Sequence, residues 1–519
     1  MDVRCASAVF FNGKVYTLAR HRQMAKAIAV ADGRIVGVGD DSEIKRMAPR
    51  GAYKIDLGGR AVVPGFIDCH THFVQMGLDA MTVDLSHTKT IDEALSLMKE
   101  SAKKTPHGEW VVGTNWKESG WENGRFMTRK DLDDCCPENP AVAHRVCGHL
   151  SSVNTRAIEL LGIDDKTQDV ERDASGRLTG ILTEGAVSIV RNALKPDESR
   201  KMRGLMLAIH KAHSLGVTSI NDNCSQGDLA IYRCAEKAGK LCVRTYLNMP
   251  SDALDSLLEL SYVSGIGSEW LKLGGLKIFC DGALGARTAA LSEPFADDPG
   301  NKGMLVHSRK EFDDIIMRTH EADMQLAVHA IGDAGIEVTI KAIEAALERR
   351  PRKDHRHRIE HLELPAVGHL KRMRTSKIIA SMQPNFIGEW GGTDGMYLVR
   401  LGPRRLVRNN PFKEILNSRV KLVFGSDCMP FSPVYGIHSA VNAPHDAQRI
   451  SVSAAVSAYT RDAAYASFEE RLKGTIEEGK LADFVVLSAD PFEDPKAISS
   501  IVVLKTVVGG SIVFERRKR

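Results

Sequence analysis

Two histidines one residue apart, His70 and His72, follow an apolar run over residues 62–67. Side chains alternate along a β-strand, so residues i and i+2 point to the same face. Two imidazoles on one face, at the end of a buried strand, can bind a single metal ion. The pattern also fits two polar residues that leave a sheet for solvent, because motifs this short occur by chance. The rest of the chain decides between these interpretations.

Polar residues that could serve as ligands or bases stand at the ends of four further apolar segments. Lys277 lies within one of them, His329 and His361 end two others, and Asp427 follows the last. Taken singly, each has a structural alternative: a hydrogen-bonded core histidine, a lysine whose amine reaches solvent, or an aspartate that caps a loop. A barrel gathers the carboxyl ends of its strands on one face. The shared position at strand ends therefore favours one common site.

The middle of the chain alternates apolar segments with helical patterns. Thr90 and Glu93 form the capping-box pattern of a helix through about Lys103, and residues 333–350 carry an apolar stripe at helical spacing. Eight strand–helix units predict an α/β fold of the (β/α)8 TIM-like barrel type. A doubly wound open sheet is the second choice, although no Gly-x-Gly-x-x-Gly motif follows a strand. The strand candidates are the segment before His70 and residues 216–220, 243–247, 276–279, 326–329, 358–361, 379–382 and 422–425.

Both ends of the chain are rich in β-strand patterns. Residues 8–11 and 14–18 flank Asn12-Gly13, and residues 27–30 and 34–38 flank Asp32-Gly33, which are hairpin signals. Because neither end has enough strands for a sheet of its own, we expect one small β-sandwich domain formed from residues 1–60 and 466–519. The barrel then occupies residues 61–465, with an insertion at about 108–191 after its first unit. Further strand candidates for the sandwich are residues 483–487, 501–504 and 511–514.

The composition of the 519 residues, 43% hydrophobic and 26% charged, is that of a globular protein. The net charge of +4 comes partly from the tail at residues 516–519, and no basic stripe with aromatics accompanies it, so we expect no nucleic-acid partner. Ten scattered cysteines without a Cys-x-x-Cys motif favour free thiols in a reducing compartment. Residues 1–4 lack the start of a signal peptide, and no run of 18 apolar residues occurs. We expect a cytoplasmic protein without a membrane span.

The residue types at the strand ends indicate metal-dependent hydrolysis. Imidazole and carboxylate ligands suit zinc, with manganese, iron and cobalt as further options. A divalent metal lowers the pKa of its bound water toward about 7 and polarises a carbonyl. Asp427 beside that water would accept its proton as general base and return it to a departing amine. The expected reaction is attack of a metal-bound hydroxide on an amide-like, non-peptide C–N bond of a small molecule.

A set of motifs distributed over nearly the whole chain carries a family resemblance. They are residues 64–72, 277–289, 328–333, 359–361, 381–384, 424–427 and 474–483. With these motifs the chain resembles the metal-dependent amidohydrolase superfamily, specifically the amidohydrolase family 3 branch that includes N-substituted formamide deformylases. The resemblance implies a barrel with a split β-sandwich, and it implies that the metal ligands are His70, His72, His329, His361 and Asp427.

Lys277 matches the lysine that relatives carboxylate with CO₂ to bridge two metals. An unmodified ammonium would be repelled by a nearby dication, so Lys277 is either carboxylated or turned away from the metal. The expected cofactor is a divalent metal, zinc first, with a second ion that depends on carboxylation of Lys277. Asp68 shares strand parity with the two histidines and could orient a ligand or accept a buried hydrogen bond. Glu360 alternates to the face opposite His361, which favours a salt bridge with Arg358 or a neighbour over catalysis.

Five residues are candidates for substrate binding. Asp281 and Arg287 follow the fourth strand and could hold substrate; Arg287 could pair a carboxylate on it or form a structural salt bridge. Trp116 and His149 lie in the insertion, which we expect to roof the active site; the tryptophans there could instead form the insertion's own core. Gln383 ends the seventh strand and could line the pocket or pack in the barrel.

Three hypotheses remain open, with hydrolysis of a small amide, formamide or cyclic amide in first place. The same site could instead perform ester or lactone hydrolysis, deamination, or a lyase or isomerase step, because metal and base serve all of these. A non-catalytic metal-binding protein is the third hypothesis, and the presence of Asp427 counts against it. We expect a small-molecule substrate and a homo-oligomer, namely a dimer.

Overall fold

The computed structural model describes residues 7–21, 23–118, 121, 124–146, 149–164, 166–225, 227–392 and 394–517. The expectations drawn from residues 1–4 and from the last two residues of the basic tail lie outside these ranges. The chain divides into two compact units, the first made of Met1–Phe73 and Ala208–Arg519 and the second of Val74–Leu207. Within the described residues, no helix combines the length and apolarity needed to cross a membrane.

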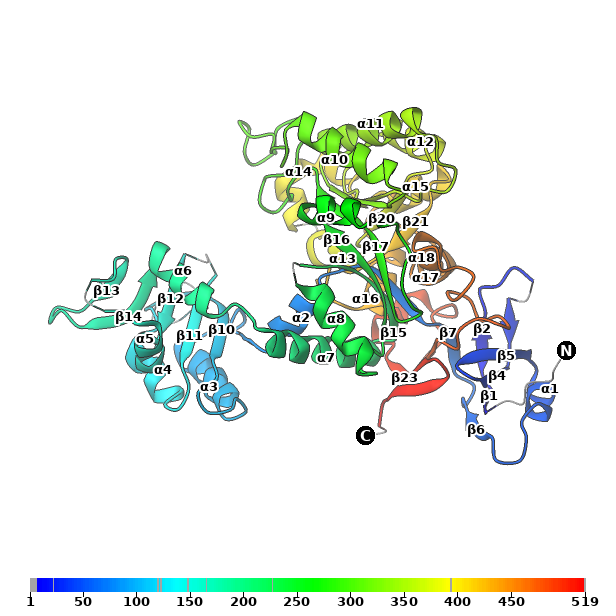
Figure 1. Ribbon diagram of the computed structural model, residues 1–519, viewed down its shortest axis with the longest axis horizontal. Coiled ribbons are helices and arrows are strands. Elements are labelled where there is room, and N and C mark those ends of the chain that lie inside the picture. Colours follow the sequence, from blue (N-terminus) through cyan, green and yellow to red (C-terminus); the bar gives the residue numbers. More distant parts are fainter. Residues whose placement is uncertain are drawn as a thin grey trace. The chain divides into compact units, whose positions relative to one another are not determined.

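The first unit contains the predicted barrel (Figure 1). Its eight parallel strands are hydrogen-bonded in sequence order, and every one overlaps a predicted segment. At the two ends of this order, the Asp427 amide donates to the His70 carbonyl over 2.8 Å, which joins the last strand to the first. The (β/α)8 TIM-like fold is therefore confirmed. The strands are β8 (Phe66–Thr71), β15 (Val217–Asn223), β16 (Arg244–Pro250), β17 (Leu271–Phe279), β18 (Leu326–Ala330), β19 (Arg358–His361), β20 (Ile379–Met382) and β21 (Leu422–Phe424).

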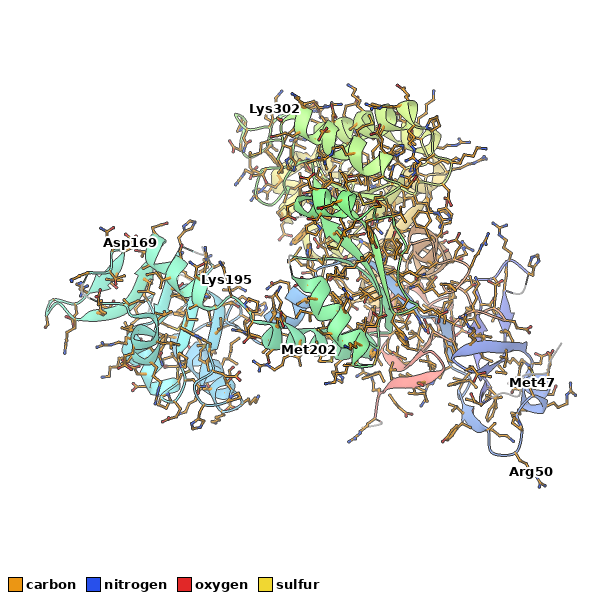
Figure 2. The ribbon with its side chains drawn as sticks, viewed as in Figure 1. Met47, Arg50, Asp169, Lys195, Met202 and Lys302 are labelled. Atoms are coloured by element: carbon orange, nitrogen blue, oxygen red, sulfur yellow. The ribbon has the colours of Figure 1, made fainter. Side chains whose placement is uncertain are left out.

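Helices follow the strands and cover them from outside. Strands β15, β18, β19 and β20 are buried at every position, as expected where helices and the barrel interior leave no exposed face. The predicted helix at 333–350 is α11 (Asp333–Arg349), and Ile336, Ile340 and Ile343 of its stripe are buried. Figure 2 labels Lys302, which lies in the long loop after β17. The Lys302 carbonyl accepts a hydrogen bond from the Leu291 amide over 2.8 Å within this loop. Other helices of the barrel are α8 (Asp228–Lys237), α10 (Arg309–Glu321), α12 (Val367–Thr375), α16 (Pro433–Val441), α17 (Val452–Ala458) and α18 (Arg461–Ala466).

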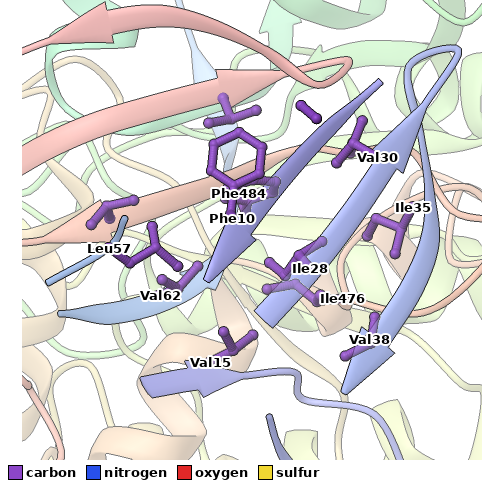
Figure 3. Close-up of a cluster of buried hydrophobic side chains, with 14 residues drawn as sticks. Phe10, Val15, Ile28, Val30, Ile35, Val38, Leu57, Val62, Ile476 and Phe484 are labelled. Carbon is purple, nitrogen blue, oxygen red and sulfur yellow. The ribbon is translucent and has the colours of Figure 1, made fainter. Parts of the chain in front are cut away.

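Strands from both chain ends form a β-sandwich in the same unit. One sheet has the order β5-β4-β1-β6, and the other has the order β24-β23-β22-β7-β2-β3. Their side chains share one apolar core, in which Phe10 and Phe484 meet edge to face at 4.8 Å (Figure 3). The strands are β1 (Ala8–Phe11), β2 (Lys14–Tyr16), β3 (Met24–Ala25), β4 (Ala27–Ala31), β5 (Arg34–Gly39), β6 (Tyr53–Asp56), β7 (Ala61–Pro64), β22 (Phe484–Leu487), β23 (Val503–Val508) and β24 (Ser511–Glu515).

One of the two predicted N-terminal hairpins is wrong. Strands β4 and β5 pair antiparallel around Asp32 and Gly33, both at positive φ, as predicted. Strands β1 and β2, however, lie in different sheets, β1 pairing with β4 and β6 and β2 with β3 and β7. The Asn12-Gly13 turn therefore carries the chain from one layer of the sandwich to the other.

The second unit is a three-layer α/β body of its own. Its sheet has the order β13-β14-β12-β11-β10-β9, and consecutive residues of β10, Val111 and Val112, enter two different apolar clusters. Since side chains alternate along a strand, these clusters lie on opposite faces of the sheet. Helices α3 and α4 contribute to one cluster, and α5 and α6 to the other. The elements are β9 (Val83–Asp84), α3 (Ile91–Ala102), β10 (Val111–Trp116), α4 (Arg129–Cys135), β11 (Ala141–Arg145), β12 (Leu150–Val153), α5 (Thr155–Leu161), β13 (Val170–Arg172), β14 (Leu178–Thr183) and α6 (Glu184–Ala193).

The second unit begins earlier and ends later than the expected insertion at 108–191. It includes α3, whose N-cap Thr90 accepts a hydrogen bond from the Glu93 amide, as the capping box predicts. The Glu93 carboxylate, however, accepts from the Lys89 amide, so only half of the capping box forms as predicted.

A buried ion pair fastens the sandwich to the barrel. Arg244 of β16 donates two hydrogen bonds to Asp483, which precedes β22, at 2.6 and 3.0 Å, and both side chains are almost fully buried. Asp483 also accepts the Gly509 amide at 2.8 Å, so one carboxylate connects a barrel strand with the β23–β24 turn.

We expect Asp483→Ala to lower the free energy of unfolding by about 3–5 kcal/mol, because it leaves Arg244 charged and unpaired in the interior. Urea denaturation followed by circular dichroism measures this loss. As a control, Asp313→Ala removes an exposed i,i+4 pair with Arg309 and should cost less than about 1 kcal/mol. Equal effects of the two substitutions would contradict the structural role of Asp483.

Candidate metal centre

Three potential ligands converge where the first and last barrel strands meet. The Asp427 Oδ1 atom lies 3.6 Å from the Nε2 atom of His70 and 3.4 Å from that of His72. All three ligand atoms lie within 4.8 Å of one another. His70 is in β8, His72 follows it, and Asp427 stands three residues beyond β21, so barrel closure brings the three together.

The other predicted ligands lie beside this cluster. The ring centroids of His70 and His361 are 4.7 Å apart, and those of His361 and His329 are 4.4 Å apart. Lys277 of β17 places its Nζ atom 3.2 Å from His70 Nε2. The structure thus gathers all six residues predicted as ligands, with three of them forming the tightest group.

The backbone is strained at two of these residues. His361 has a φ of 71° and Asp427 a φ of 52°, and the residues that follow them, Leu362 and Cys428, are at 49° and 62°. Non-glycine residues rarely adopt this left-handed region, and where they do, the surrounding structure enforces it. These positions turn the side chains of His361 and Asp427 toward the centre.

The electrostatics of the site suit a bound cation. Burial lowers the pKa of the four histidines, to about 4 for His72 and about 3 for His329, so their rings are neutral near pH 7. Neutral imidazole is the form that binds metals. His361 Nδ1 and Asp427 Oδ1 are buried without a hydrogen-bond partner, a costly state that a metal ion would relieve. The residues therefore fit a divalent metal.

Lys277 is buried, and burial lowers the pKa of its amine. Its nearest partner is a histidine nitrogen, His70 Nε2, rather than a carboxylate. A lysine amine held close to the ligand cluster with a reduced tendency to carry charge is chemically suited to react with CO₂.

Asp68 holds the backbone of two ligand segments. Its Oδ1 atom accepts the amides of His70 at 3.1 Å and Ser426 at 2.9 Å, so it connects β8 with the segment that carries Asp427. Gly425 lies against the same place: a Cβ atom there would come within 2.4 Å of the His70 nitrogen. Close approach of the two strands at the metal centre requires glycine at this position.

Two of the residues predicted to bind substrate are engaged in structural contacts. Asp281 is fully buried, and its carboxylate accepts the amides of Ala290, Ile331 and Gly332 at 2.9–3.0 Å, which fixes the loops after β17 and β18. Arg287 pairs with Asp297 at 2.7 Å. Arg287 thus has the salt bridge named as its structural alternative, while Asp281 Oδ1 also lies 3.9 Å from His329 Nε2, and substrate binding by either residue stays a prediction.

The insertion residues also have local partners. Trp116 is fully buried within the second unit, where its indole nitrogen donates to the Ala143 carbonyl over 3.0 Å and its ring stacks on Trp121. His149 is exposed in the same unit and lies 3.2 Å from Glu184. Trp116 is thus part of that unit's core.

Gln383 behaves differently from these residues. It follows β20 at the end of the barrel where the ligands gather, is 1% exposed, and has no hydrogen-bond partner at either amide atom. A buried amide without partners needs a water molecule or a ligand.

Two contacts to the ligand cluster were missed in the sequence. Glu360 accepts a hydrogen bond from His70 Nδ1 at 2.6 Å in addition to its predicted pair with Arg358 at 2.7 Å. Strand parity placed Glu360 away from the site, but parity fails here because His361 leaves the extended conformation. Phe279, two residues after Lys277, is 42% exposed and its ring lies 4.9 Å from that of His329. Its strand parity with Lys277 was the available signal.

A parallel eight-stranded barrel that gathers histidine and aspartate side chains at one end of its strands is an arrangement typical of metal-dependent hydrolases. Residues 54–514 match the model of the amidohydrolase family, and the chain belongs to this family. The resemblance found in the sequence motifs is thereby confirmed.

Two relatives align with this chain over almost their whole lengths. The chain is 32% identical to "Putative amidohydrolase YtcJ" of Bacillus subtilis (strain 168), covering 98% of this chain and 99% of that protein. It is 28% identical to the N-substituted formamide deformylase of Arthrobacter pascens, covering 98% of each. Among solved structures, an uncharacterized metal-dependent hydrolase from Pyrococcus furiosus superposes with a TM-score of 0.79 at 30% identity, covering 93% of this chain and 99% of that one.

We expect Gly425→Ala to weaken metal binding and lower stability, because its methyl group would overlap the His70 backbone and Asp68. Metal content after dialysis and thermal unfolding measure the two effects. Gly368→Ala, in the exposed first turn of α12 with no atom within 4 Å of the added Cβ, is the control and should be neutral or stabilise by up to about 1 kcal/mol. Full metal content in Gly425→Ala would contradict the proposed close approach.

Proposed function

We propose that this enzyme hydrolyses an amide-like, non-peptide C–N bond of a small molecule, with Asp427 as general base and acid. The observation that carries the proposal is the position of Asp427 Oδ1, which is buried, lacks a hydrogen-bond partner and faces the Nε2 atoms of His70 and His72. A carboxylate so placed can accept a proton from a water molecule bound at the site and hold it.

Residues His70, His72, His329, His361 and Asp427 would hold the metal, zinc by the preference of imidazole and carboxylate for that ion. When bound, the metal polarises the substrate carbonyl and makes water more acidic. The Asp427 carboxylate accepts the proton that the attacking water loses. It then returns the proton to the departing amine nitrogen, and the Asp427 backbone, fixed by its hydrogen bond to His70, keeps the carboxylate in place for both transfers.

Lys277 supports a second metal ion in this proposal. The ammonium first loses one proton, and the free amine then adds to CO₂ to form a carbamate and releases a second. A cationic neighbour of the candidate ligands would thereby become an anionic carboxylate that could hold a second metal ion. The buried position of Lys277, 3.2 Å from His70 Nε2, supports this modification.

Two residues at the end of the barrel strands where the candidate ligands gather bear on the substrate. Phe279 is 42% exposed with its ring 4.9 Å from that of His329, and Gln383 is buried with no partner at either amide atom. These features favour a substrate with an amide or formamide group next to an apolar substituent, and the N-substituted formamide deformylase among the relatives supports the same class. Ester or lactone hydrolysis, deamination and lyase or isomerase chemistry remain the alternatives. The roofing role of the insertion, the dimer and the cytoplasmic location stay predictions.

The decisive experiment combines metal analysis with a hydrolysis screen over N-formyl amines, N-acyl amino acids, hydantoins and lactones. Release of amine that depends on bound metal supports the proposal. Turnover of lactones alone would overturn the assignment to C–N bonds, and turnover that survives complete metal removal would overturn the metal-dependent mechanism.

Asp427→Asn should reduce kcat by at least about 100-fold while part of the metal stays bound, because the amide can still coordinate through oxygen but cannot accept the proton. Steady-state kinetics on the best substrate of the screen, together with metal content, test this. Asp446→Asn, which changes an exposed aspartate paired with Lys413, is the control and should retain activity. Full activity of Asp427→Asn would remove Asp427 from its assigned role.

We expect two metal ions per chain in the wild type and one in Lys277→Met, because only the carboxylated lysine supplies the bridge. Intact-mass spectrometry under native conditions and metal analysis measure modification and stoichiometry. One ion per chain with an unmodified Lys277 would refute the two-metal version and leave the Asp427 mechanism standing.

A further inference from the structure

A connected set of buried polar side chains fills the centre of the barrel below the ligands. His70 Nδ1 donates to Glu360 Oε2 at 2.6 Å, and Glu360 Oε1 accepts from Arg358 Nε at 2.7 Å. Arg358 also donates to Asn221 Oδ1 at 2.7 Å and to the Cys69 carbonyl at 3.3 Å. The side chains of His70, Glu360 and Arg358 are all 0% exposed.

The two oxygens of Glu360 serve different partners. One accepts from Arg358 and the other from His70, so the carboxylate cannot rotate without breaking a hydrogen bond. A carboxylate oxygen accepts hydrogen bonds, so the 2.6 Å contact between Glu360 Oε2 and His70 Nδ1 favours the tautomer with its proton on Nδ1. The unprotonated Nε2 atom then faces Lys277 at 3.2 Å and Asp427 at 3.6 Å.

Arg358 is itself held by other barrel strands. Asn221 belongs to β15, and its Oδ1 atom also accepts a hydrogen bond from Ser467 at 2.9 Å. The Cys69 carbonyl belongs to β8 and immediately precedes His70. Arg358 therefore contacts the backbone next to His70 and, through Glu360, the ring of His70.

We propose that Glu360 is a positioning residue that sets the tautomer and ring orientation of His70, and that Arg358 fixes Glu360 in the geometry this requires. The inference rests on the proposed function only in naming a metal as the partner of Nε2. A purely structural alternative, in which the ion pair fastens β19 inside the barrel, makes no demand on His70.

The first test uses the metal-free protein. Nitrogen-15 NMR of labelled histidine distinguishes the Nδ1–H from the Nε2–H tautomer, and His70→Asn assigns the signal. In the wild type, His70 should be the Nδ1–H form alone. In the double variant Arg358→Met/Glu360→Leu, which replaces the pair by apolar side chains and avoids an unpaired buried charge, the Nε2–H form should become populated. An unchanged His70 signal in the folded double variant would overturn the proposal.

The second test measures metal affinity by competition with a chelator, using zinc. Glu360→Gln and the double variant should each raise the zinc dissociation constant by about 10–100-fold, the usual effect of losing a carboxylate partner of a ligand histidine. In a His70→Asn background, Glu360→Gln should add no further loss, because Glu360 acts through His70. An equal loss with and without His70 would show a general structural effect and overturn the proposal.

Glu469→Gln is the matched control. Glu469 is a buried carboxylate paired with Lys473 at 2.7 Å and Lys272 at 3.1 Å, away from the ligand histidines. Its substitution should lower the unfolding temperature without changing zinc affinity or the His70 signal. A comparable loss of affinity in Glu469→Gln would assign the Glu360 effect to stability. If the wild type binds no zinc, the proposed function fails, yet the tautomer measurement still decides the role of Glu360.

Discussion

The metal centre depends on how the last barrel strand meets the first. The Asp427 amide donates to the His70 carbonyl, Asp68 accepts amides from both segments, and Gly425 allows their backbones to touch. Two candidate ligands separated by more than three hundred residues are thereby placed by hydrogen bonds to the backbone. The contacts that close the barrel between its last and first strands therefore also bring these side chains together.

A second constraint explains why so many polar groups can gather in a buried place. Burial keeps the histidines neutral, while Glu360 is compensated by Arg358. Among the buried atoms without a hydrogen-bond partner are His361 Nδ1, Asp427 Oδ1 and both amide atoms of Gln383. Glu360 and Arg358 thus satisfy each other, while atoms of the candidate ligands stay available for a metal ion.

The sequence could predict the strands and the gathering of the candidate ligands because both follow from short-range patterns. A continuous apolar run indicates a strand that is buried on both faces. Residues of metal-ligating types at the ends of several strands indicate that their side chains meet at one end of the barrel. The hairpin predicted at Asn12-Gly13 is wrong because a turn motif indicates that the chain reverses but does not indicate which sheet the next strand joins. Trp116 and Asp281 were ambiguous for a similar reason. The Ala143 carbonyl that accepts from Trp116 lies on another strand, and the three amides that donate to Asp281 lie in loops that carry no sequence pattern.

Glu360 shows where local reasoning stops and why. Parity is valid only while the backbone is extended, and His361 leaves that conformation at a φ of 71°. Glu360 and His361, although adjacent in the sequence, both contact His70: the Glu360 carboxylate binds its Nδ1 atom, and the His361 ring packs next to its ring. When a residue other than glycine adopts the left-handed conformation, the local sequence does not indicate it, because the surrounding packing enforces that conformation. The strained positions at His361 and Asp427 are thus the part of the site that only the folded barrel determines, and they are also the positions that aim its ligands.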